Sequence, residues 1–422
     1  MKNMIDRFKY LKFYLGICIG LCVMPTAYAD FMKDSKASVN LRNFFIERDF
    51  QHLPNKSIGS WAQAVSGRFE SGYTDTALKL GLNLNSQYAL RLTDHNAERP
   101  DTIFKYDPVA RKQQRDYLKL GVTLKMKYDK SELQIGELYP RTPVASFDNS
   151  RLLQTTFAGA LFESKVIDQL KLSAGHINRV NARNNDRFEK LSLSAPGKPR
   201  YTSQGLSFVG FDYQLHPSIT AAYWYGQLLD IYQQHYLNAV YSTQIGENKL
   251  KLDARYFNNS EVGDAYYGKI DSRSLGLQGS LHNGSHMLTL GVQKNDGRSV
   301  FPTISGFAPQ LFLQTWSTLG FTKSEELTYH ALYSYDFKQH GLDGLKMSLR
   351  YLHGSGIARA GLKDNRESEA NYILSYVVPD GELKGLGFEW RHIRADTKYG
   401  AGHQVGGGFV EDRLITSYSF KF

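Results

Sequence analysis

The stretch YLKLGVTLKMKY, residues 117 to 128, alternates apolar and polar side chains along its whole length. Leucine, valine, methionine and tyrosine occupy the even positions, whereas lysine and threonine occupy most of the odd ones. Successive side chains of a β-strand point to opposite faces. The stretch therefore predicts a strand with one apolar and one polar face.

This alternation recurs along the chain and predicts about 18 strands. Turns of about two residues, such as 129–130 and 246–247, alternate with long polar connections. An antiparallel barrel across a membrane sorts its loops in this way, with short periplasmic turns and long extracellular loops. A water-soluble β-sandwich does not require it. The predicted strands begin near residues 38, 60, 76, 117, 131, 156, 170, 204, 218, 235, 249, 273, 286, 326, 346, 370, 384 and 413, and the long connections lie near residues 93–116, 178–203, 258–272, 294–325, 354–369 and 394–412.

The N-terminal segment has the features of a secretory signal peptide, with basic residues before an apolar run and a small-residue cleavage site. Both cysteines, Cys18 and Cys22, lie inside it, so disulfides cannot stabilise the exported chain. No later stretch reaches the roughly 18 to 20 apolar residues that a spanning helix needs. We therefore predict a signal peptide at 1–29 and one barrel domain at 30–422.

The final residues, RLITSYSFKF at 413–422, alternate in the same way and end on phenylalanine. This ending is similar to the targeting signature of bacterial outer-membrane barrels. Backbone amides in a bilayer core find no water, and only a closed sheet leaves none of them unpaired. About 18 strands enclose a lumen too wide to fill with side chains. We therefore predict an all-β transmembrane antiparallel β-barrel in the outer membrane that forms a pore.

The basic excess of the chain falls on the predicted lumenal face. Removing the signal's four basic and one acidic residues from 51 and 41 leaves 47 and 40, a net charge of +7. On the strands, inward basic residues outnumber inward acids such as Glu70, Asp253 and Glu389. Such a wall attracts anions and offers forked hydrogen-bond donors to carboxylates. In the alternative interpretation, acidic residues of the loops neutralise the same arginines, which then only support the structure of the lumen. The basic residues predicted to point inward are Arg42, Arg48, Arg68, Lys125, Arg255, Arg350, Arg391 and Arg413.

A stiff, charged segment, LYPRTPVASFDNSRLL at 138–153, lies between two alternating stretches. Proline cannot donate to a sheet ladder, so Pro140 and Pro143 end the strand. In the strand count, residues 139–155 form the third outer loop. A rigid charged loop could fold into the lumen and narrow it, and composition alone leaves an external position open. The candidates for the constriction are Arg141, Asp148, Asn149, Ser150 and Arg151.

Two motifs, DSKASVNLRNFFIERDF at 34–50 and LYPRTPVASFDNSRLLQTTFAGA at 138–160, resemble the OprD-type outer-membrane porins, also called outer-membrane carboxylate channels. The similarity spans nearly all of the mature chain. It implies a barrel whose third and seventh loops fold into the lumen, with a ladder of basic residues on one wall. It also implies that residues of the seventh loop line the eyelet, the narrowest part of the lumen, and Asp296 and Ser305 are the candidates. An acid such as Asp148 is expected to accept a cationic group of the solute.

The resemblance implies passive, substrate-selective diffusion of small carboxylate-bearing solutes, including amino acids, small organic or aromatic acids and, for some members, carbapenems. We expect no cofactor, no metal site, no catalysis and no nucleic-acid partner. The expected partners are small anionic or zwitterionic solutes, outer-membrane lipid and the barrel-assembly machinery, and the expected state is a monomer or weak oligomer. One alternative is a general diffusion porin. Another is an outer-membrane lipid hydrolase, since His353 and Ser355 have the His-x-Ser spacing of such enzymes.

Two smaller features give local expectations. His282 and His286 flank the turn at 283–284 and are expected to be surface histidines rather than metal ligands. Arg394 departs from the parity of Arg391, which predicts either a bulge or a position above the membrane.

Overall fold

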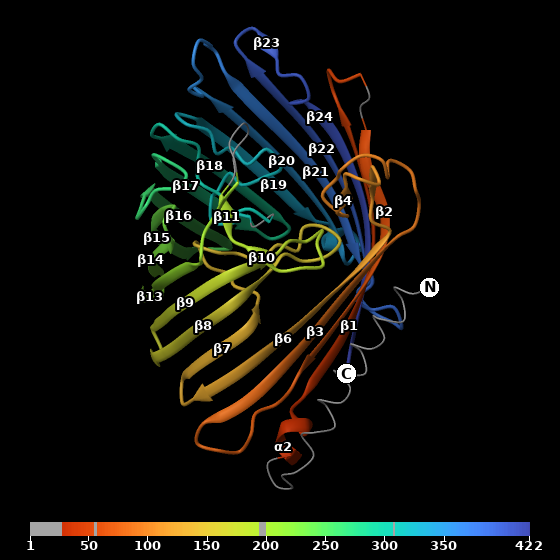
Figure 1. Cartoon of the computed structure of the whole chain (residues 1–422), viewed down its shortest axis with the longest axis vertical. Coiled ribbons are helices and arrows are strands. Elements are labelled where there is room, and N and C mark those ends of the chain that lie inside the picture. The colour runs from red at the N-terminus through yellow and green to blue at the C-terminus, as the bar shows by residue number, and fades with distance from the viewer. Residues whose placement is uncertain (1–27, 55–56, 194–199, 307–308) are drawn as a thin grey trace.

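A closed sheet forms the body of the protein. The computed structural model describes residues 28–54, 57–193, 200–306 and 309–422. Within these ranges, 18 long strands pair antiparallel in chain order, and β1 (Lys36–Phe50) pairs with β24 (Phe409–Lys421) to close the ring. Figure 1 shows the strands around an interior that is crossed by loop segments, among them those that carry the short strands β10 (Glu189–Lys190) and β11 (Ser192–Leu193).

The strand bounds agree closely with the predicted ones. The remaining long strands are β2 (Ser57–Glu70), β3 (Lys79–Arg91), β6 (Asp116–Tyr128), β7 (Ser131–Leu138), β8 (Thr156–Ile167), β9 (Leu170–Asn181), β13 (Leu206–His216), β14 (Ile219–Leu228), β15 (Tyr232–Ile245), β16 (Asn248–Glu261), β17 (Asp271–Asn283), β18 (His286–Asp296), β19 (Leu327–Asp336), β20 (Leu345–Ser355), β21 (Arg366–Val377) and β22 (Gly387–Tyr399). The largest difference in a start is four residues, at β21 (predicted 370, observed 366) and at β24 (predicted 413, observed 409). The short elements are α2 (Tyr28–Lys33), β4 (Tyr106–Asp107), β5 (Lys112–Gln113), β12 (Tyr201–Thr202), η1 (Phe337–His340) and β23 (Gly402–His403).

The two faces of the strands have opposite surroundings. In β6, Leu120 is 48% exposed, whereas its neighbour Lys119 is 1% exposed. Leu118, Val122 and the other apolar residues of this parity are exposed as well, which confirms the predicted alternation. A water-soluble protein buries leucine and exposes lysine. The reversed pattern places the apolar face against lipid and the polar face toward the barrel interior.

The connections differ at the two ends of the barrel. At one end many of them are tight turns, such as residues 129–130 and 246–247, and at the other most of them are long. Three connections at the turn end, 71–78, 337–344 and 378–386, are longer than a tight turn. Two outer connections, 51–56 and 229–231, are short, so the sorting is less regular than predicted. The long outer connections that matter below are loop 2 (92–115), loop 3 (139–155), loop 4 (182–205) and loop 7 (297–326).

Apolar contacts hold the long loops inside the barrel. One cluster joins Phe104 of loop 2 and Leu152 of loop 3 to Phe44 of β1. A second joins loops 3, 4 and 7 to the inner face of β13–β16 through residues such as Val144 and Leu313. Full burial of one such side chain stabilises the loop by about 1.5 to 3 kcal/mol. The predicted infolding of loops 3 and 7 is confirmed, and loops 2 and 4 pack inside as well.

The N-terminal segment is described only in part. Residues 1–27 of the predicted signal peptide lie outside the described ranges, and Tyr28 and Ala29 begin α2. Within those ranges, no helix combines the length and the apolar character needed to cross a membrane.

Candidate functional site

Loop 3 is fastened to the barrel wall by a buried lysine. Lys119 of β6 donates from Nζ to the backbone carbonyls of Gln154 (2.5 Å), Asn181 (3.3 Å) and Ala182 (3.2 Å). A buried ammonium group needs such acceptors because its desolvation is otherwise very unfavourable. Lys119 therefore fixes the C-terminal half of loop 3 against the end of β9.

Loops 3 and 7 contact each other inside the barrel. The amide of Gln310 in loop 7 donates to the carbonyl of Pro143 in loop 3 at 2.9 Å, and Gln234 of β15 donates to the same oxygen at 2.8 Å. Farther along, the hydroxyl of Thr155 donates to the carbonyl of Gly306 at 3.0 Å. The two loops thus form one hydrogen-bonded layer across the lumen.

The tip of loop 3 faces arginines from several elements. Glu411 of β24 accepts hydrogen bonds from the Nε of Arg48 (2.7 Å) and the Nε of Arg413 (2.5 Å). Arg183 of loop 4 pairs with Asp148 of loop 3 at 2.6 Å, and both side chains are buried. Charge-assisted pairs of this kind are short and directional. We name the group the loop-3 cluster; it consists of Arg42, Arg48, Arg151, Arg183, Arg391 and Arg413 with Asp148, Glu389 and Glu411.

The loop-3 cluster has a positive excess. Its six arginines and three carboxylates give a formal charge of 6 − 3 = +3. Arg391 pairs with Glu389 at 2.9 Å, and Arg42 donates to the carbonyl of Asn149 at 3.0 Å. The Nε atoms of Arg42, Arg151 and Arg391 are buried and have no hydrogen-bond partner in the described part of the chain. These three donors therefore lack an acceptor from the described protein.

Arg151 is buried within the loop-3 cluster, beside other arginines. Burial, reinforced by the neighbouring charges of Arg413 and Arg183, lowers the pKa of the Arg151 guanidinium well below its usual range. Desolvation and like charges both disfavour the charged form of a guanidinium. An anion beside Arg151 offsets both effects.

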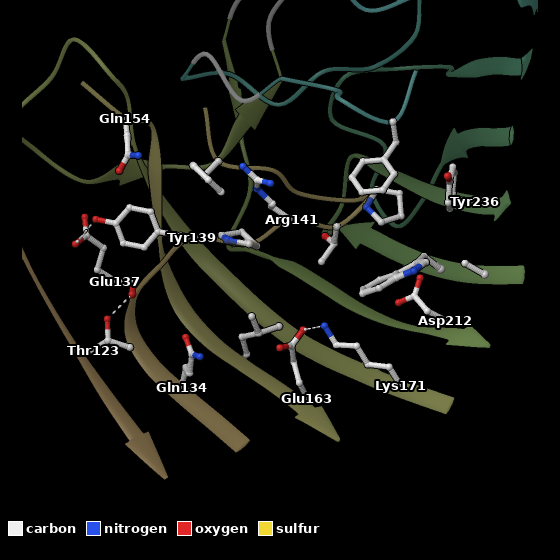
Figure 2. Close-up of a pocket in the computed structure, with 18 of the residues that line it drawn as sticks. Thr123, Gln134, Glu137, Tyr139, Arg141, Gln154, Glu163, Lys171, Asp212 and Tyr236 are labelled. Carbon is white, nitrogen blue, oxygen red and sulfur yellow. Dashed lines mark hydrogen bonds and ion pairs between the residues drawn. The ribbon is translucent and has the colours of Figure 1, made fainter. Parts of the chain in front are cut away.

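A cavity of about 460 Å³ lies against the first half of loop 3 (Figure 2). Lys171 of β9 pairs with Glu163 of β8 at 2.5 Å. Figure 2 shows this pair and Asp212 of β13 on the same wall of the cavity. Arg141 of loop 3 lies over the ring of Phe147, 4.9 Å from its centroid. We name this space the loop-3 cavity; besides these groups, its lining includes Glu137, Tyr139, Trp224, Tyr236 and Phe312. It therefore offers charges of both signs beside aromatic surfaces.

Two of the predicted ladder residues support loop 7 instead. Arg255 of β16 pairs with Asp253 at 2.7 Å and donates to the carbonyl of Phe312 at 2.9 Å. Arg350 of β20 donates to the carbonyl of Gln314 at 2.7 Å. Their forked donors are directed to loop 7, so these arginines position the loop.

Two others lie toward the turn end of the barrel. Arg68 pairs with Glu70 at 2.5 Å and lies over the ring of Tyr139, 5.4 Å from its centroid. Lys125 donates to the carbonyl of Ser71 at 3.1 Å. All eight predicted basic residues occupy the inward parity of their strands, and four of them, Arg42, Arg48, Arg391 and Arg413, come together in one place.

Four of the five predicted constriction residues lie at the tip of loop 3, whereas Arg141 lines the loop-3 cavity. One of the four has a different role from the predicted one. Asp148 accepts from Arg183 and from the backbone amide of Ser150, the latter at 2.8 Å. Its carboxylate is therefore already occupied and buried, so it is not free to accept a cationic solute group. Asn149 and Arg151 lie beside it in the loop-3 cluster.

The two predicted seventh-loop residues lie elsewhere. Asp296 shares the outward parity of Leu288 and Leu290 at the end of β18, and it pairs with Arg273 at 3.0 Å. It therefore belongs to the outer rim and not to an eyelet. Ser305 donates from its backbone amide to the carbonyl of Ser192 in β11, at 2.9 Å, and connects loop 7 to loop 4.

Periodicity did not predict the roles of three residues of this arrangement. Arg183 follows β9 in a polar loop with no alternation, so nothing in its surroundings indicates a lumenal position. Glu411 shares the parity of Arg413 two residues later, and this signal could have found it. Lys119 was assigned to the polar face, but its three acceptors come from segments distant in the sequence.

The residues of the alternative lipid-hydrolase and metal sites are not arranged as such sites require. His353 and Ser355 occupy the outward parity of β20, and no carboxylate contacts His353 in the residues that the structure covers. His282 points inward from β17, whereas His286 points outward from β18 and is 2.8 Å from the hydroxyl of Tyr333. Among the described residues, no group of three or more metal-ligating side chains occurs.

A closed ring of antiparallel strands with a lipid-facing apolar belt, and a charged interior narrowed by its own loops, defines an outer-membrane channel. Residues 29–422 match the family described as outer membrane porin, OprD family. The chain therefore belongs to the OprD family of outer-membrane porins, and its relatives are channels and not enzymes.

Individual relatives agree with this assignment. The porin-like protein GalP of Pseudomonas putida is 27% identical over 390 residues, which is 92% of each chain. The crystal structure of Acinetobacter baumannii OccAB4 superposes with a TM-score of 0.86 at 34% identity and covers 93% of this chain and 100% of that one. The structure of Pseudomonas aeruginosa OpdK with vanillate gives a TM-score of 0.82 at 29% identity, with coverage of 93% and 100%.

Proposed function

We propose that this porin passes small carboxylate-bearing solutes by passive diffusion, and that the loop-3 cluster selects them. The observation that carries the proposal is the formal charge of +3 at the infolded loop, with three buried Nε donors that lack a protein partner. Guanidinium groups present their donors in a fork that matches a carboxylate. A carboxylate is therefore drawn to this level of the channel.

Fast passage also requires that the solute leaves again. Within the loop-3 cluster, Glu389 and Glu411 already neutralise part of the charge of Arg391, Arg48 and Arg413. A solute carboxylate competes with these acids for the same donors, so its binding is weakened. The arrangement supports brief capture and release at several adjacent arginines.

The loop-3 cavity supports small aromatic acids as one substrate class. Tyr139, Trp224 and Phe312 border it, next to the charged side chains. Vanillate, present in the OpdK structure, combines an aromatic ring with a carboxylate. Amino acids suit the same space because Asp212 and Glu163 lie on its wall. Transport of carbapenems, assembly by the barrel-assembly machinery and a monomeric or weakly associated state are further predictions from the family resemblance.

The test is single-channel recording in planar bilayers with a panel of carboxylates, comparing the wild type with Arg391→Ala. We expect block and flux of anionic solutes to weaken by about tenfold, because a charge-assisted hydrogen bond contributes about 1.5 to 3 kcal/mol. Arg394→Ala is the matched control. Arg394 lies on the same strand, in a regular part of β22 without a bulge, and is exposed on the outward parity. Equal behaviour of the two variants would contradict selection at the loop-3 cluster.

The general diffusion porin is the competing function. It predicts that no individual carboxylate blocks the ion current at low concentration and that permeation depends on size alone. Recording with neutral solutes of matched size separates the two, since only the selective channel prefers the carboxylate.

A further inference from the structure

A second cavity, of about 770 Å³, lies on the inner face of β15–β20, away from the loop-3 cluster. We name its basic residues the lysine patch. No aspartate or glutamate is among the described residues that line this cavity, in contrast to the loop-3 cavity. The lysine patch consists of Lys249, Lys251, His282, His330 and Arg350.

The two lysines are neighbours on one strand and lack partners. Lys249 and Lys251 share the inward parity of β16, and His282 of β17 lies directly opposite Lys249 in the register. Alternate residues of a strand are about 6.5 to 7 Å apart. Neither lysine nor His282 forms an ion pair or hydrogen bond within the described ranges. The two lysine charges are therefore exposed to the barrel interior without a direct ion-pair partner in the described structure.

His330 is a second, independent sign of a ligand. It lines the same cavity, is 5% exposed, and neither ring nitrogen has a hydrogen-bond partner in the described part of the protein. Its ring lies over Gly291, its register partner on β18, where an added Cβ would be 2.2 Å from Nε2. A buried imidazole without partners is unfavourable unless something else accepts or donates.

Loop 7 separates the lysine patch from the outer part of the channel. Arg350 donates to the backbone carbonyls of Gln314 (2.7 Å) and Trp316 (3.1 Å). Lys249 lies closer than Arg350 to the turn end of the barrel, next to the turn at 246–247. Periplasmic turns are the short ones in this class of barrel. A solute that has passed loop 7 therefore meets the lysine patch on its way to the periplasm.

We propose that the lysine patch is a second anion site that holds small dicarboxylates at the periplasmic side of loop 7. One carboxylate pairs with Lys249 and Lys251, while the other lies toward His330 and the charge of Arg350. A monocarboxylate leaves part of this unbalanced charge unpaired, so the dianion binds more tightly. The inference rests on the proposed function in that both require passage of carboxylate solutes.

The experiment uses the full chain in planar bilayers, with succinate or butyrate added to both compartments. In Lys249→Gln/Lys251→Gln, the succinate concentration that halves the current should rise on the order of tenfold, whereas the value for butyrate should change less than about twofold. Lys130→Gln/Lys384→Gln removes the same charge from two periplasmic turns and should behave as the wild type. His330→Leu should fold normally, by heat-modifiable migration on gels, and should weaken succinate block.

Each outcome decides the matter. Unchanged succinate block in Lys249→Gln/Lys251→Gln overturns the site, as does an equal loss in the turn-lysine control. If only Arg391→Ala weakens carboxylate block, the lysine patch is wrong and the proposed function stands. If only the lysine variant weakens it, the lysine patch stands and selection at the loop-3 cluster is wrong.

Discussion

The loop-3 cluster and the lysine patch are both cationic, but they are built differently. In the loop-3 cluster, Glu411 holds two arginines and Asp148 holds one in fixed positions, at 2.5 to 2.7 Å. In the lysine patch, no carboxylate lines the cavity and the two lysines are unpaired in the described structure. Fixed arginines can discriminate by geometry, whereas unpaired lysines on flexible stems respond mainly to charge. The comparison suggests a selective level followed by a charge-sensing level.

The largest expected effect is the release of loop 3 by Asp148→Ala. This change leaves the buried guanidinium of Arg183 without its carboxylate, and breaking a buried ion pair costs about 3 to 5 kcal/mol. We expect the tip of loop 3 around Asp148 to leave its position, with a higher single-channel conductance and a weaker preference among carboxylates. Ser146→Ala, in the same loop but outside the ion pairs, is the control. Wild-type conductance in Asp148→Ala would show that the pair does not position the loop.

A smaller effect is expected when the lysine patch is made similar to the loop-3 cluster. Gln278→Glu adds one carboxylate to the acid-free cavity with almost no change in volume. The new acid should pair with the unpaired lysines and raise the half-blocking concentration of succinate severalfold. Reversal potentials in a salt gradient should shift toward cations. A stronger succinate block in Gln278→Glu would contradict the charge-sensing role.

The smallest effect concerns the loop that separates the two regions. Burial next to Glu367 raises the pKa of Glu326, at the end of loop 7, to about 8, while Lys323 of the same loop opposes the shift. The folded protein therefore holds a proton that an unfolded chain releases above its ordinary carboxyl pKa. The contribution of this proton to the stability of the folded protein is complete below the ordinary carboxyl pKa. It is lost as the pH rises through about 8.

We therefore expect loop 7 to loosen slightly above pH 8, seen as increased current noise in bilayer recordings. Glu326→Gln keeps the neutral form and should flatten this dependence between about pH 6 and 9. Its neighbour provides the control, because Glu325 pairs with Lys294 at 3.1 Å and the pKa of Glu325 is lowered. An unchanged pH profile in Glu326→Gln would remove this group as the cause.

Sequence periodicity predicted the barrel well and the site only partly. Alternation reports the face of each side chain, so Arg42, Arg391 and Arg413 were assigned inward correctly. It does not report the register between strands or the path of a loop, and these decide that Arg183 meets Asp148 while Arg255 meets loop 7. The lysine patch was missed for the same reason, since its members come from four strands.

Loops were the hardest part to predict. Loop 7 carries Ser305 to the carbonyl of Ser192 and leaves Asp296 on the outer rim, although both belong to one polar stretch in the sequence. Loop 2 enters the lumen because Ile103 and Phe104 have an apolar surface to pack against, and that surface exists only once β1 and loop 3 are in place. Local composition holds no information about such distant partners.

The pairing of β1 with β24 has a consequence for what the channel can carry. Its register runs without interruption from Ser38–Lys421 to Phe50–Phe409, so the wall has no loose seam at the closure. At this closure, a solute in the lumen finds no gap that leads sideways into the bilayer. Hydrophobic compounds therefore have no lateral exit to the membrane between β1 and β24, whatever their fit to the charges of the lumen.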